Sequence, residues 1–122
     1  MKRILVVEDE VALQYLLKDE LNEEGFEVSL AANGREALRM LKEDEARGQI
    51  PEIVILDVRM PEMDGLETMG HILKEKFKTK VIIHSAYSQF RDDYLAQVAD
   101  AYVVKSHDMS VLKSRIKDLL GE

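Results

Sequence analysis

The sequence lacks cysteine altogether, since none occurs among its 122 residues. Disulfide bonds and thiolate metal sites are therefore excluded. Long apolar runs are also missing, because no N-terminal stretch resembles a signal peptide and no segment resembles a membrane span. From these absences we expect a soluble, cytoplasmic protein with no membrane insertion.

An excess of positive charge is missing as well. The chain has 17 lysines and arginines against 24 aspartates and glutamates, which gives a formal net charge of -7 at pH 7. A surface of this sign is repelled by nucleic acid phosphates, so we predict no direct nucleic-acid binding. The three histidines, His71, His84 and His107, do not have the spacing of metal ligands, and we predict structural or surface positions for them.

Two patterns of apolar residues alternate along the chain: short continuous runs, and residues with helical spacing. Five short runs rich in Val and Ile predict strands at residues 4–7, 26–30, 53–56, 81–83 and 101–104. Between them, Asn33 and Glu36 form the pattern of an N-cap with a capping-box partner. Residues with helical spacing predict the other helices: Leu13, Leu16, Leu17 and Leu21; Leu66, Met69, Leu73 and Phe77; Tyr94, Leu95 and Val98; and Leu112, Ile116 and Leu119.

This alternation predicts an α/β fold of five parallel strands and five helices. Crossovers between parallel strands run through the helices, which then cover both faces of the sheet. The runs at 4–7, 53–56 and 81–83 are the most continuously apolar and are expected at its centre. Ligands of such sheets bind beyond the carboxyl ends of the strands, where the strand order reverses. Polar residues that follow the runs are therefore candidate functional residues.

Charged and polar residues follow four of the expected strands. Glu8 and Asp9 follow the first strand and Asp57 the third. Ser85 comes after the fourth strand and Lys105 after the fifth. Carboxylates crowded at one edge repel one another, and Mg2+ suits a site with few carboxylates, retained waters and an incoming phosphate oxygen. An ammonium group and a hydroxyl suit the oxygens of a phosphoryl group, so the pattern predicts Mg2+-dependent phosphoryl chemistry.

Three motifs, in this order, carry a resemblance to a known family: VVEDE at 6–10, ILDVRMPEMDG at 55–65 and YVVK at 102–105. Through them the whole chain resembles the receiver domain of two-component response regulators. The resemblance implies a flavodoxin-like, doubly wound fold with strand order 2-1-3-4-5. It also implies that the protein accepts a phosphoryl group from a phosphohistidine of a sensor histidine kinase or a phosphotransfer protein.

The resemblance further implies a role for each residue that matches the family motifs. Asp57 is the nucleophile that forms an acyl phosphate. Asp9 binds Mg2+ directly, and Glu8 binds it directly or through water. The backbone carbonyl of Arg59 completes the protein ligands, together with the Asp57 carboxylate.

The remaining roles concern the switch. Ser85 and Lys105 hold the phosphoryl oxygens, and Tyr102 matches the aromatic residue that changes rotamer on activation. When the Ser85 hydroxyl moves toward the phosphoryl group, it vacates space that favours an inward Tyr102. The surface around the fourth helix, fifth strand and fifth helix then changes for a downstream effector protein. On this account the protein is a signalling phosphoacceptor that catalyses only its own phosphorylation and dephosphorylation.

Two features depart from the family pattern. Ser106 follows Lys105 where the family usually has proline, often with a cis bond. A cis bond before serine costs about 2.5–4 kcal/mol, so we predict a trans bond and a more mobile loop. The interval from Ser85 to Lys105 is slightly short, and Ala99-Asp100-Ala101 replaces the usual small-residue step. We therefore predict a short or irregular fourth helix.

No repeat, low-complexity tract or linker divides the chain. A length of 122 residues with 46% hydrophobic content suits one domain with one core. Because Leu120-Gly121-Glu122 closely follows the expected fifth helix, we expect a receiver domain at 1–122 and no effector domain. A stand-alone regulator, a phosphorelay intermediate and a receiver cut from a longer chain all stay open.

Two other functions share features with this one. A phosphatase of the haloacid dehalogenase type also uses a strand-end aspartate, but it requires a second aspartate two residues later, where this chain has Arg59. A degenerate receiver that binds proteins without phosphorylation is another alternative, although no acid or lysine of the site is missing. For single residues, the simpler interpretations are Asp57 as a helix cap and Tyr102 as a packing residue of an edge strand.

Overall fold

A computed structural model describes residues 1–122 and contains one parallel sheet of five strands in the order β2-β1-β3-β4-β5. This is the predicted order. The strands are β1 (Arg3–Val7), β2 (Glu27–Ala31), β3 (Ile53–Leu56), β4 (Lys80–Ser85) and β5 (Ala101–Val104). The helices are α1 (Val11–Glu23), α2 (Gly34–Ala46), α3 (Gly65–Lys74), the 3-10 helix η1 (Gln89–Asp92), α4 (Tyr94–Gln97) and α5 (Ser110–Leu120). None of these helices has the length and apolar character needed to cross a membrane.

Side chains of the central strands point alternately into two hydrophobic cores. In β1, Leu5 and Val7 pack into the core that α2 and α3 cover, whereas Ile4 and Val6 pack into the core under α1 and α5. The same alternation occurs in β3 and β4. Strands that are buried on both faces are apolar at every position, so their runs are continuous. The prediction that β1, β3 and β4 are central is confirmed.

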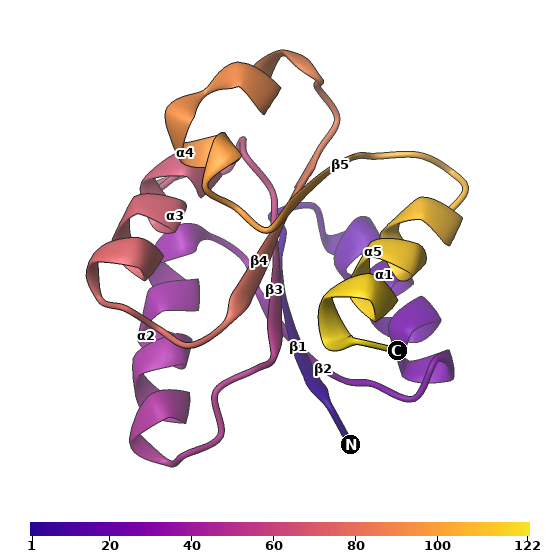
Figure 1. Ribbon diagram of the computed structural model, residues 1–122, viewed down its shortest axis with the longest axis horizontal. Coiled ribbons are helices and arrows are strands. Elements are labelled where there is room, and N and C mark those ends of the chain that lie inside the picture. Colours follow the sequence, from indigo (N-terminus) through magenta and orange to yellow (C-terminus); the bar gives the residue numbers. More distant parts are fainter.

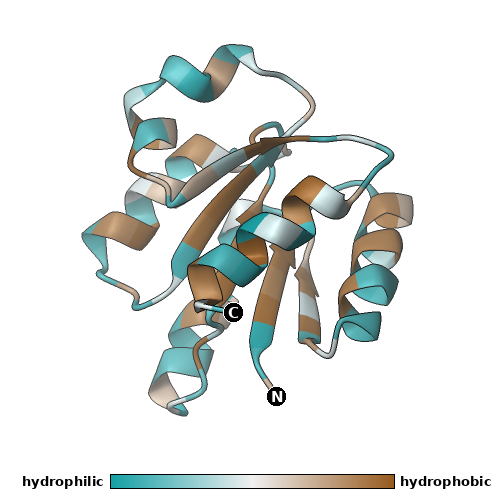
Figure 2. Cartoon of the chain, turned by 45° about the vertical axis from the view of Figure 1, so that its right-hand side comes forward, coloured by the Kyte–Doolittle hydropathy of each residue, from teal (hydrophilic) through white to brown (hydrophobic).

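The helices form two layers around the sheet. α2, α3 and α4 lie on one face, and α1 and α5 lie on the other (Figure 1). Figure 2 shows predominantly apolar strands between helices that carry polar residues on their outer surfaces. The chain runs from β1 to β2 on one side and then to β3 on the other, so the strand order reverses between β1 and β3. This reversal places a ligand site beyond the carboxyl ends of these two strands.

The loop between β3 and α3 packs closely against the end of β3. The backbone N–H of Gly65 donates to the carbonyl of Val58 at 2.7 Å. A Cβ atom on Gly65 would overlap the carbonyl oxygen of Asp57, so glycine is required for this approach. Asp64 then caps α3, because its Oδ1 accepts from the backbone N–H of Glu67 at 2.8 Å. The loop thereby fixes the backbone that follows Asp57.

The N-terminus of α2 forms at the predicted cap. Oδ1 of Asn33 accepts from the backbone N–H of Glu36 at 2.8 Å. The Asn33 amide group donates to the carboxylate of Glu62 in the β3–α3 loop at 3.0 Å. Only the Asn33 half of the expected capping box is therefore formed, and the same side chain also joins two loops at the carboxyl edge of the sheet.

Three apolar residues with the predicted helical spacing do not lie on the buried face of a helix. Leu16 in α1 and Leu73 in α3 are 49% and 45% exposed, and Phe77 is buried but lies beyond the end of α3. Leu16 and Leu73 are exposed because the apolar stripes of these two helices are wider than the surface that the sheet covers. The residues of α3 that are buried are Gly65, Thr68, Met69 and Ile72.

The fourth helix is short, as predicted. α4 has four residues, and Oδ1 of Asp93 caps it by accepting from the backbone N–H of Leu95 at 2.9 Å. Only Ala96 of this helix is buried, and Tyr94 is 75% exposed. Because most helical stability comes from packing an apolar face, this segment gains little from a longer helix.

The peptide bond between Lys105 and Ser106 is trans, as are all others in the chain. This confirms the prediction made from serine at that position. Oγ of Ser106 accepts from the backbone N–H of Asp108 at 3.2 Å, which forms a local turn in the loop after β5. The greater mobility expected of this loop stays a prediction.

Lys76 has a backbone φ of 58°, in the left-handed region that favours glycine. It lies at the end of α3, where the N–H of Phe77 donates to the carbonyl of Ile72 at 3.3 Å. We expect Lys76→Gly to raise the free energy of unfolding by about 0.5–1 kcal/mol, since the relieved strain exceeds the added entropy of the unfolded chain. Urea unfolding measures the change. The control Lys74→Gly, within α3, should lower it by about 1 kcal/mol, and an equal loss at both positions would contradict this account.

Candidate functional site

Four strands carry polar residues to the same edge of the sheet. The backbone N–H groups of Glu8 and Asp57 donate to the last carbonyls of the neighbouring strands β2 and β1, each at 3.0 Å. The N–H of Lys105 donates to the carbonyl of Ser85 at 2.7 Å. The parallel hydrogen-bonding pattern thus continues beyond the strands and holds these residues at one edge, as the sequence predicted.

The ammonium group of Lys105 lies between two buried carboxylates. Its Nζ is 2.7 Å from Oε1 of Glu8 and 3.2 Å from Oδ2 of Asp57. Glu8 is 2% exposed and Asp57 is 7% exposed, so solvent screens these interactions only weakly. The pair with Asp57 agrees with the position that the sequence predicted for Lys105. The closer pair with Glu8 was not predicted.

Backbone N–H groups hold the other oxygens of the two carboxylates. Oδ1 of Asp57 accepts from the N–H of Val58 at 2.8 Å, and Oε2 of Glu8 accepts from the N–H of Glu10 at 3.1 Å. Gln14, which is buried in α1, donates its side-chain amide to the Glu8 carbonyl. Both acids are therefore oriented from the backbone side, and Oδ2 of Asp57 lies on the side of Lys105.

Three carboxylates at this edge are close enough to share one cation. One oxygen atom from each of Glu8, Asp9 and Asp57 lies within 4.8 Å of the others. Asp9 is exposed and the other two are buried, so the cluster is open to water on one side. An oxygen-only ligand set that leaves room for water suits a hard divalent cation such as Mg2+. The role of the Arg59 carbonyl as a further ligand stays a prediction.

The buried charges shift the pKa values of both partners. Burial raises the pKa of Glu8 from 4.5 to about 7, although the hydrogen bonds from Lys105 and the Glu10 backbone act in the opposite direction. Burial alone would lower the pKa of Lys105, but its hydrogen bond to Glu8 and the charges of Asp57 and Glu8 outweigh this effect and raise it. Two buried carboxylates therefore compete for one ammonium group. A divalent cation would relieve this competition by stabilising their charged forms.

Ser85 and Tyr102, the two residues predicted to switch, are joined through Tyr87. The Ser85 hydroxyl is buried, and its Oγ accepts from the backbone N–H of Tyr87 at 3.1 Å. The hydroxyl of Tyr102, which is half-buried, donates to the carbonyl of Tyr87. The guanidinium of Arg91 lies 5.1 Å from the centroid of the Tyr102 ring. Ser85 and Tyr102 were predicted from the sequence, whereas no motif indicated a role for Tyr87.

The side chain of Arg59 was not predicted to have a role, because the sequence indicated only its backbone carbonyl, as a Mg2+ ligand. Its guanidinium lies 4.7 Å from the ring centroid of Tyr87 and 5.4 Å from that of Phe90. These are cation–π distances. The arginine therefore joins the loop after Asp57 to the segment after β4.

His84 is 4% exposed in β4, whereas His71 and His107 are exposed. Burial, together with the charge of Lys105, lowers the pKa of the His84 imidazole from 6.5 to about 4. Between these values the unfolded chain binds a proton that the folded protein does not, so this histidine makes the free energy of unfolding fall as the pH falls. The expected loss over that range is about 3 kcal/mol.

Urea unfolding of the wild type and of His84→Leu over this pH range measures the effect. The difference in unfolding free energy between the two proteins should change by that amount, because Glu8 and the other acids titrate in both. An identical pH dependence of the two proteins would contradict the burial of a neutral His84.

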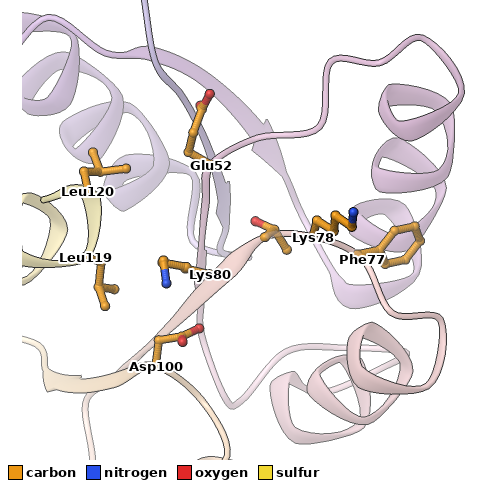
Figure 3. Close-up of a pocket in the computed structure, with 8 residues that line it drawn as sticks. Glu52, Phe77, Lys78, Lys80, Asp100, Leu119 and Leu120 are labelled. Atoms are coloured by element: carbon orange, nitrogen blue, oxygen red, sulfur yellow. The ribbon is translucent and has the colours of Figure 1, made fainter.

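The largest cavity, about 490 Å3, does not contain the candidate site. It lies at the opposite edge of the sheet, beside the beginnings of β3 and β4 and the end of α5 (Figure 3). Two acids in its wall already accept from backbone N–H groups, Glu52 from Arg3 and Asp100 from Val81 at 2.7 Å. These two carboxylates therefore stabilise the local backbone, and the cavity wall does not bring catalytic groups together. Its walls are Glu52, Phe77, Lys78, Thr79, Lys80, Asp100, Leu119 and Leu120.

A sequence profile of the response regulator receiver domain matches residues 4–117 of this chain. The chain belongs to the response regulator receiver domain family. This receiver domain is similar to the response regulator TrrA from Thermotoga maritima in complex with Mg2+-BeF, with 46% identity, 98% of this chain and 99% of that chain covered, and a TM-score of 0.87. It is also similar to TrrA in complex with the histidine kinase ThkA, with 47% identity, the same coverage and a TM-score of 0.86.

A curated relative of this receiver domain is the probable transcriptional regulator ycf27 of Cyanophora paradoxa. The two are 36% identical over 121 residues, which cover 98% of this chain and 48% of the relative. The chain spans about half or less of the length of the first curated relatives it matches. The similarity therefore establishes the receiver domain, and the activities of the longer proteins are not transferred with it.

Proposed function

We propose that this receiver domain accepts a phosphoryl group on Asp57 from a phosphohistidine of a partner protein, in a Mg2+-dependent reaction. The observation that carries the proposal is the Asp57 carboxylate, which is 7% exposed at the end of the central strand β3. One of its oxygens accepts from Val58 at 2.8 Å and the other lies 3.2 Å from Nζ of Lys105. A carboxylate that is oriented in this way beside a cation is suited to act as a nucleophile.

The proposed reaction forms one bond and breaks another. A carboxylate oxygen of Asp57 attacks phosphorus, and the phosphorus–nitrogen bond of the phosphohistidine breaks. The product is an acyl phosphate on Asp57, and the released imidazole keeps the electron pair and takes up a proton. Attack of water on phosphorus later releases inorganic phosphate and restores the carboxylate. The domain then catalyses only its own phosphorylation and dephosphorylation.

Glu8, Asp9, Asp57 and the carbonyl of Arg59 are the proposed ligands of Mg2+. The bound ion would neutralise charge on the phosphoryl oxygens and on the carboxylates that they approach. The carboxylate oxygens within 4.8 Å of one another support this assignment. The similar TrrA structure, solved in complex with Mg2+-BeF, supports it as well, since beryllium fluoride on a carboxylate resembles a phosphoryl group in shape and charge.

Lys105 and Ser85 are proposed to bind the phosphoryl oxygens. The ammonium group of Lys105 already contacts Oδ2 of Asp57 and supplies a compact positive charge. The Ser85 hydroxyl accepts from Tyr87, so its own O–H remains to donate to a phosphoryl oxygen. In the strand order the two residues, on β4 and after β5, lie on the other side of Asp57 from Glu8 and Asp9, although the long Lys105 side chain also reaches Glu8.

A sensor histidine kinase or a phosphotransfer protein is the proposed phosphoryl donor. Val11, Tyr15 and Leu16 on α1 expose 61%, 57% and 49% of their surfaces. Leu16 also lines a cavity of about 300 Å3, together with Leu13, Lys105 and the loop after β5. An apolar surface beside the reacting carboxylate fits a partner helix that presents a histidine. The similar TrrA structure in complex with a histidine kinase supports this choice.

The proposed output is a change of the surface formed by α4, β5 and α5. Tyr102 lies in β5, and its hydroxyl is bound to the Tyr87 carbonyl, two residues after Ser85. A phosphoryl group that accepts from the Ser85 hydroxyl would therefore stabilise this arrangement of Tyr87 and Tyr102 relative to others. A downstream effector protein is proposed to bind the altered surface.

Intact mass spectrometry after incubation with a small acyl phosphate donor tests the proposed function. With Mg2+ the protein should gain the mass of one phosphoryl group, and without Mg2+ or with excess chelator it should not. Absence of any gain under both conditions would favour the phosphorylation-independent binding module. Sustained release of inorganic phosphate, in many-fold excess over the protein and with no persisting adduct, would favour a phosphatase.

Asp9→Ala tests the metal assignment. Removing one of three carboxylates is expected to weaken Mg2+ binding at least about tenfold, and to slow phosphorylation at limiting Mg2+ by a similar factor. Without Mg2+ the fold should be as stable as wild type or slightly more so, because one like charge is removed. A Mg2+ titration of the phosphorylation rate measures the effect. The exposed neighbour Glu10 provides the control Glu10→Ala, and equal Mg2+ dependence of both variants would refute the assignment.

A further inference from the structure

Tyr87, in the segment that follows β4, connects three residues of the candidate site. Its backbone N–H donates to Oγ of Ser85 at 3.1 Å, and its carbonyl accepts from the Tyr102 hydroxyl. Its ring lies 4.7 Å from the guanidinium of Arg59. One residue of an exposed segment thus joins the proposed phosphoryl ligand, the proposed switch residue and the loop that follows Asp57.

The partners of the Arg59 guanidinium are two aromatic rings. It lies 4.7 Å from the ring of Tyr87 and 5.4 Å from that of Phe90, and these two rings pack edge to face with centroids 6.0 Å apart. A cation shared by two rings restrains both of them. Because Phe90 belongs to η1, the contact ties the loop that follows Asp57 to the segment just before α4.

The segment that Arg59 contacts is mostly exposed, and Phe90 is the residue of η1 that packs against the core under α2 and α3. Tyr87 is 44% exposed, η1 has no buried residue and α4 has one. Segments with few buried contacts open at low free-energy cost. The contact with Arg59 is therefore a substantial part of what keeps Tyr87 in place.

The arrangement around Tyr87 is compatible with a phosphoryl group on Asp57. A serine hydroxyl donates one hydrogen bond and accepts others. Because Oγ of Ser85 accepts from Tyr87, its O–H is left to donate to a phosphoryl oxygen. The same arrangement holds the Tyr102 hydroxyl on the Tyr87 carbonyl. A bound phosphoryl group would thus need no rearrangement of Tyr87.

We propose that Arg59 is a positioning residue: by holding the Tyr87 ring, it keeps the Ser85 hydroxyl and Tyr102 in the arrangement that receives the phosphoryl group. The inference rests on the proposed function of Asp57. Without the Arg59 contact, the segment samples other arrangements, and a bound phosphoryl group must restore the receptive one. The apparent dissociation constant for such a group equals the intrinsic one divided by the fraction of molecules in the receptive arrangement, so apparent affinity falls as this fraction falls.

A double-mutant cycle on Arg59 and Tyr87 tests the proposal. The measured quantity is the apparent dissociation constant of beryllium fluoride, with Mg2+ in excess. Arg59→Gln should weaken binding roughly two- to fivefold, the range of an exposed cation–π contact. In the Tyr87→Leu background the same change should have a much smaller effect, since the contact with Tyr87 is already lost and only the longer one with Phe90 remains. Arg59→Lys keeps the charge but not the planar guanidinium, and should recover only part of the affinity.

A direct electrostatic effect of Arg59 on the bound anion predicts different results. Arg59→Gln would then weaken binding equally in both backgrounds, and Arg59→Lys would restore it fully. Either of these results would overturn the proposal, as would an unchanged affinity of Arg59→Gln.

Tyrosine NMR without any ligand gives an independent readout. In protein labelled with 13C at tyrosine Cζ, the signal of Tyr102 is assigned with Tyr102→Phe. Arg59→Gln and Tyr87→Leu should each shift this signal toward that of a solvated tyrosine. The control Arg115→Gln, on α5 with an ion pair to Asp118 at 4.0 Å, should not shift it.

A Tyr102 signal that is unchanged in Arg59→Gln would overturn the positioning role. If the wild-type protein fails to bind beryllium fluoride, the proposed function of Asp57 fails instead, and the Tyr102 signal alone decides whether Arg59 positions Tyr87.

Discussion

Asp57→Asn is expected to reduce the rate of phosphorylation by a small acyl phosphate donor at least about 100-fold, because a neutral carboxamide does not form the acyl phosphate. The fold should remain intact. Asparagine retains an oxygen for the hydrogen bond from Val58, and Lys105 still pairs with Glu8 at 2.7 Å. Intact mass spectrometry over time, with Mg2+ present, measures the rate.

The matched control for this variant is Asp19→Asn on the exposed side of α1. It removes the same charge and should be phosphorylated at the wild-type rate. If Asp57→Asn gained the phosphoryl mass as fast as the control, another residue would be the acceptor and the proposed function would be wrong.

Lys105→Met is expected to lower the free energy of unfolding by about 2 kcal/mol in the absence of Mg2+. Removing one partner from a buried ion pair costs about 3–5 kcal/mol, and the lower figure allows for the 20% exposure of the Lys105 side chain. Methionine preserves the length and apolar contacts of the stem, so the loss reports the missing charge. Phosphorylation should also slow at least about tenfold, since one cation at the phosphoryl position is lost.

The pH and Mg2+ dependence distinguish this loss from a packing defect. Burial raises the pKa of Glu8 from 4.5 to about 7, so between these values Glu8 holds a proton in the folded state that it has lost in the unfolded state. The contribution of Glu8 to stability therefore falls as the pH rises from about 4.5 through about 7, and loss of Lys105, which lowers this pKa, should extend the fall to higher pH. Mg2+ should stabilise Lys105→Met more than the wild type, because it replaces the missing positive charge near Glu8 and Asp57.

Urea unfolding with and without Mg2+ measures both effects. Lys113→Met is the control, since Lys113 pairs with Glu20 at 2.6 Å between α5 and α1, away from the carboxylate cluster. Its stability should change little and should not depend on Mg2+. If both lysine variants responded alike to Mg2+, the special role of Lys105 between two buried carboxylates would be refuted.

The strands could be located from the sequence because the central ones are buried on both faces. Such strands leave continuous apolar runs, and the runs at 4–7 and 53–56 match β1 and β3 almost residue for residue. The apolar criterion failed at the end of β4, which continues through His84 and Ser85. Both side chains are buried there, because a central strand buries polar residues as well when the adjacent helices and loops cover them. The order of the strands came from the family resemblance and not from periodicity.

The sequence was enough to predict which residues form the site, but not which of them form ion pairs with one another. Parallel topology brings the carboxyl ends of all strands to one edge, and this was enough to group Asp9, Asp57 and Lys105. Strand order places β5 beside β4 and not beside β1, so it gave no reason to expect the 2.7 Å contact of Lys105 with Glu8. That contact depends on the reach of a long side chain across the end of the sheet.

The contacts of Arg59 and Tyr87 were beyond sequence reasoning for a related reason. Each residue lies in a loop, where neither the helical nor the strand period applies, and the two loops follow different strands. Which side chains meet above the sheet depends on loop conformations that local propensity does not determine. A surface arginine and a surface tyrosine carry no motif that would have paired them.

The most direct test of the account locates the phosphoryl group on the chain. The protein is incubated with Mg2+ and a small acyl phosphate donor, reduced with borohydride, which converts an aspartyl phosphate into homoserine, and then digested for peptide mass mapping. We predict homoserine at position 57 alone, and only in samples that contained both Mg2+ and the donor. Unmodified Asp57 in protein that has gained the phosphoryl mass, or homoserine at any other aspartate, would contradict the assignment of Asp57 as the phosphoacceptor.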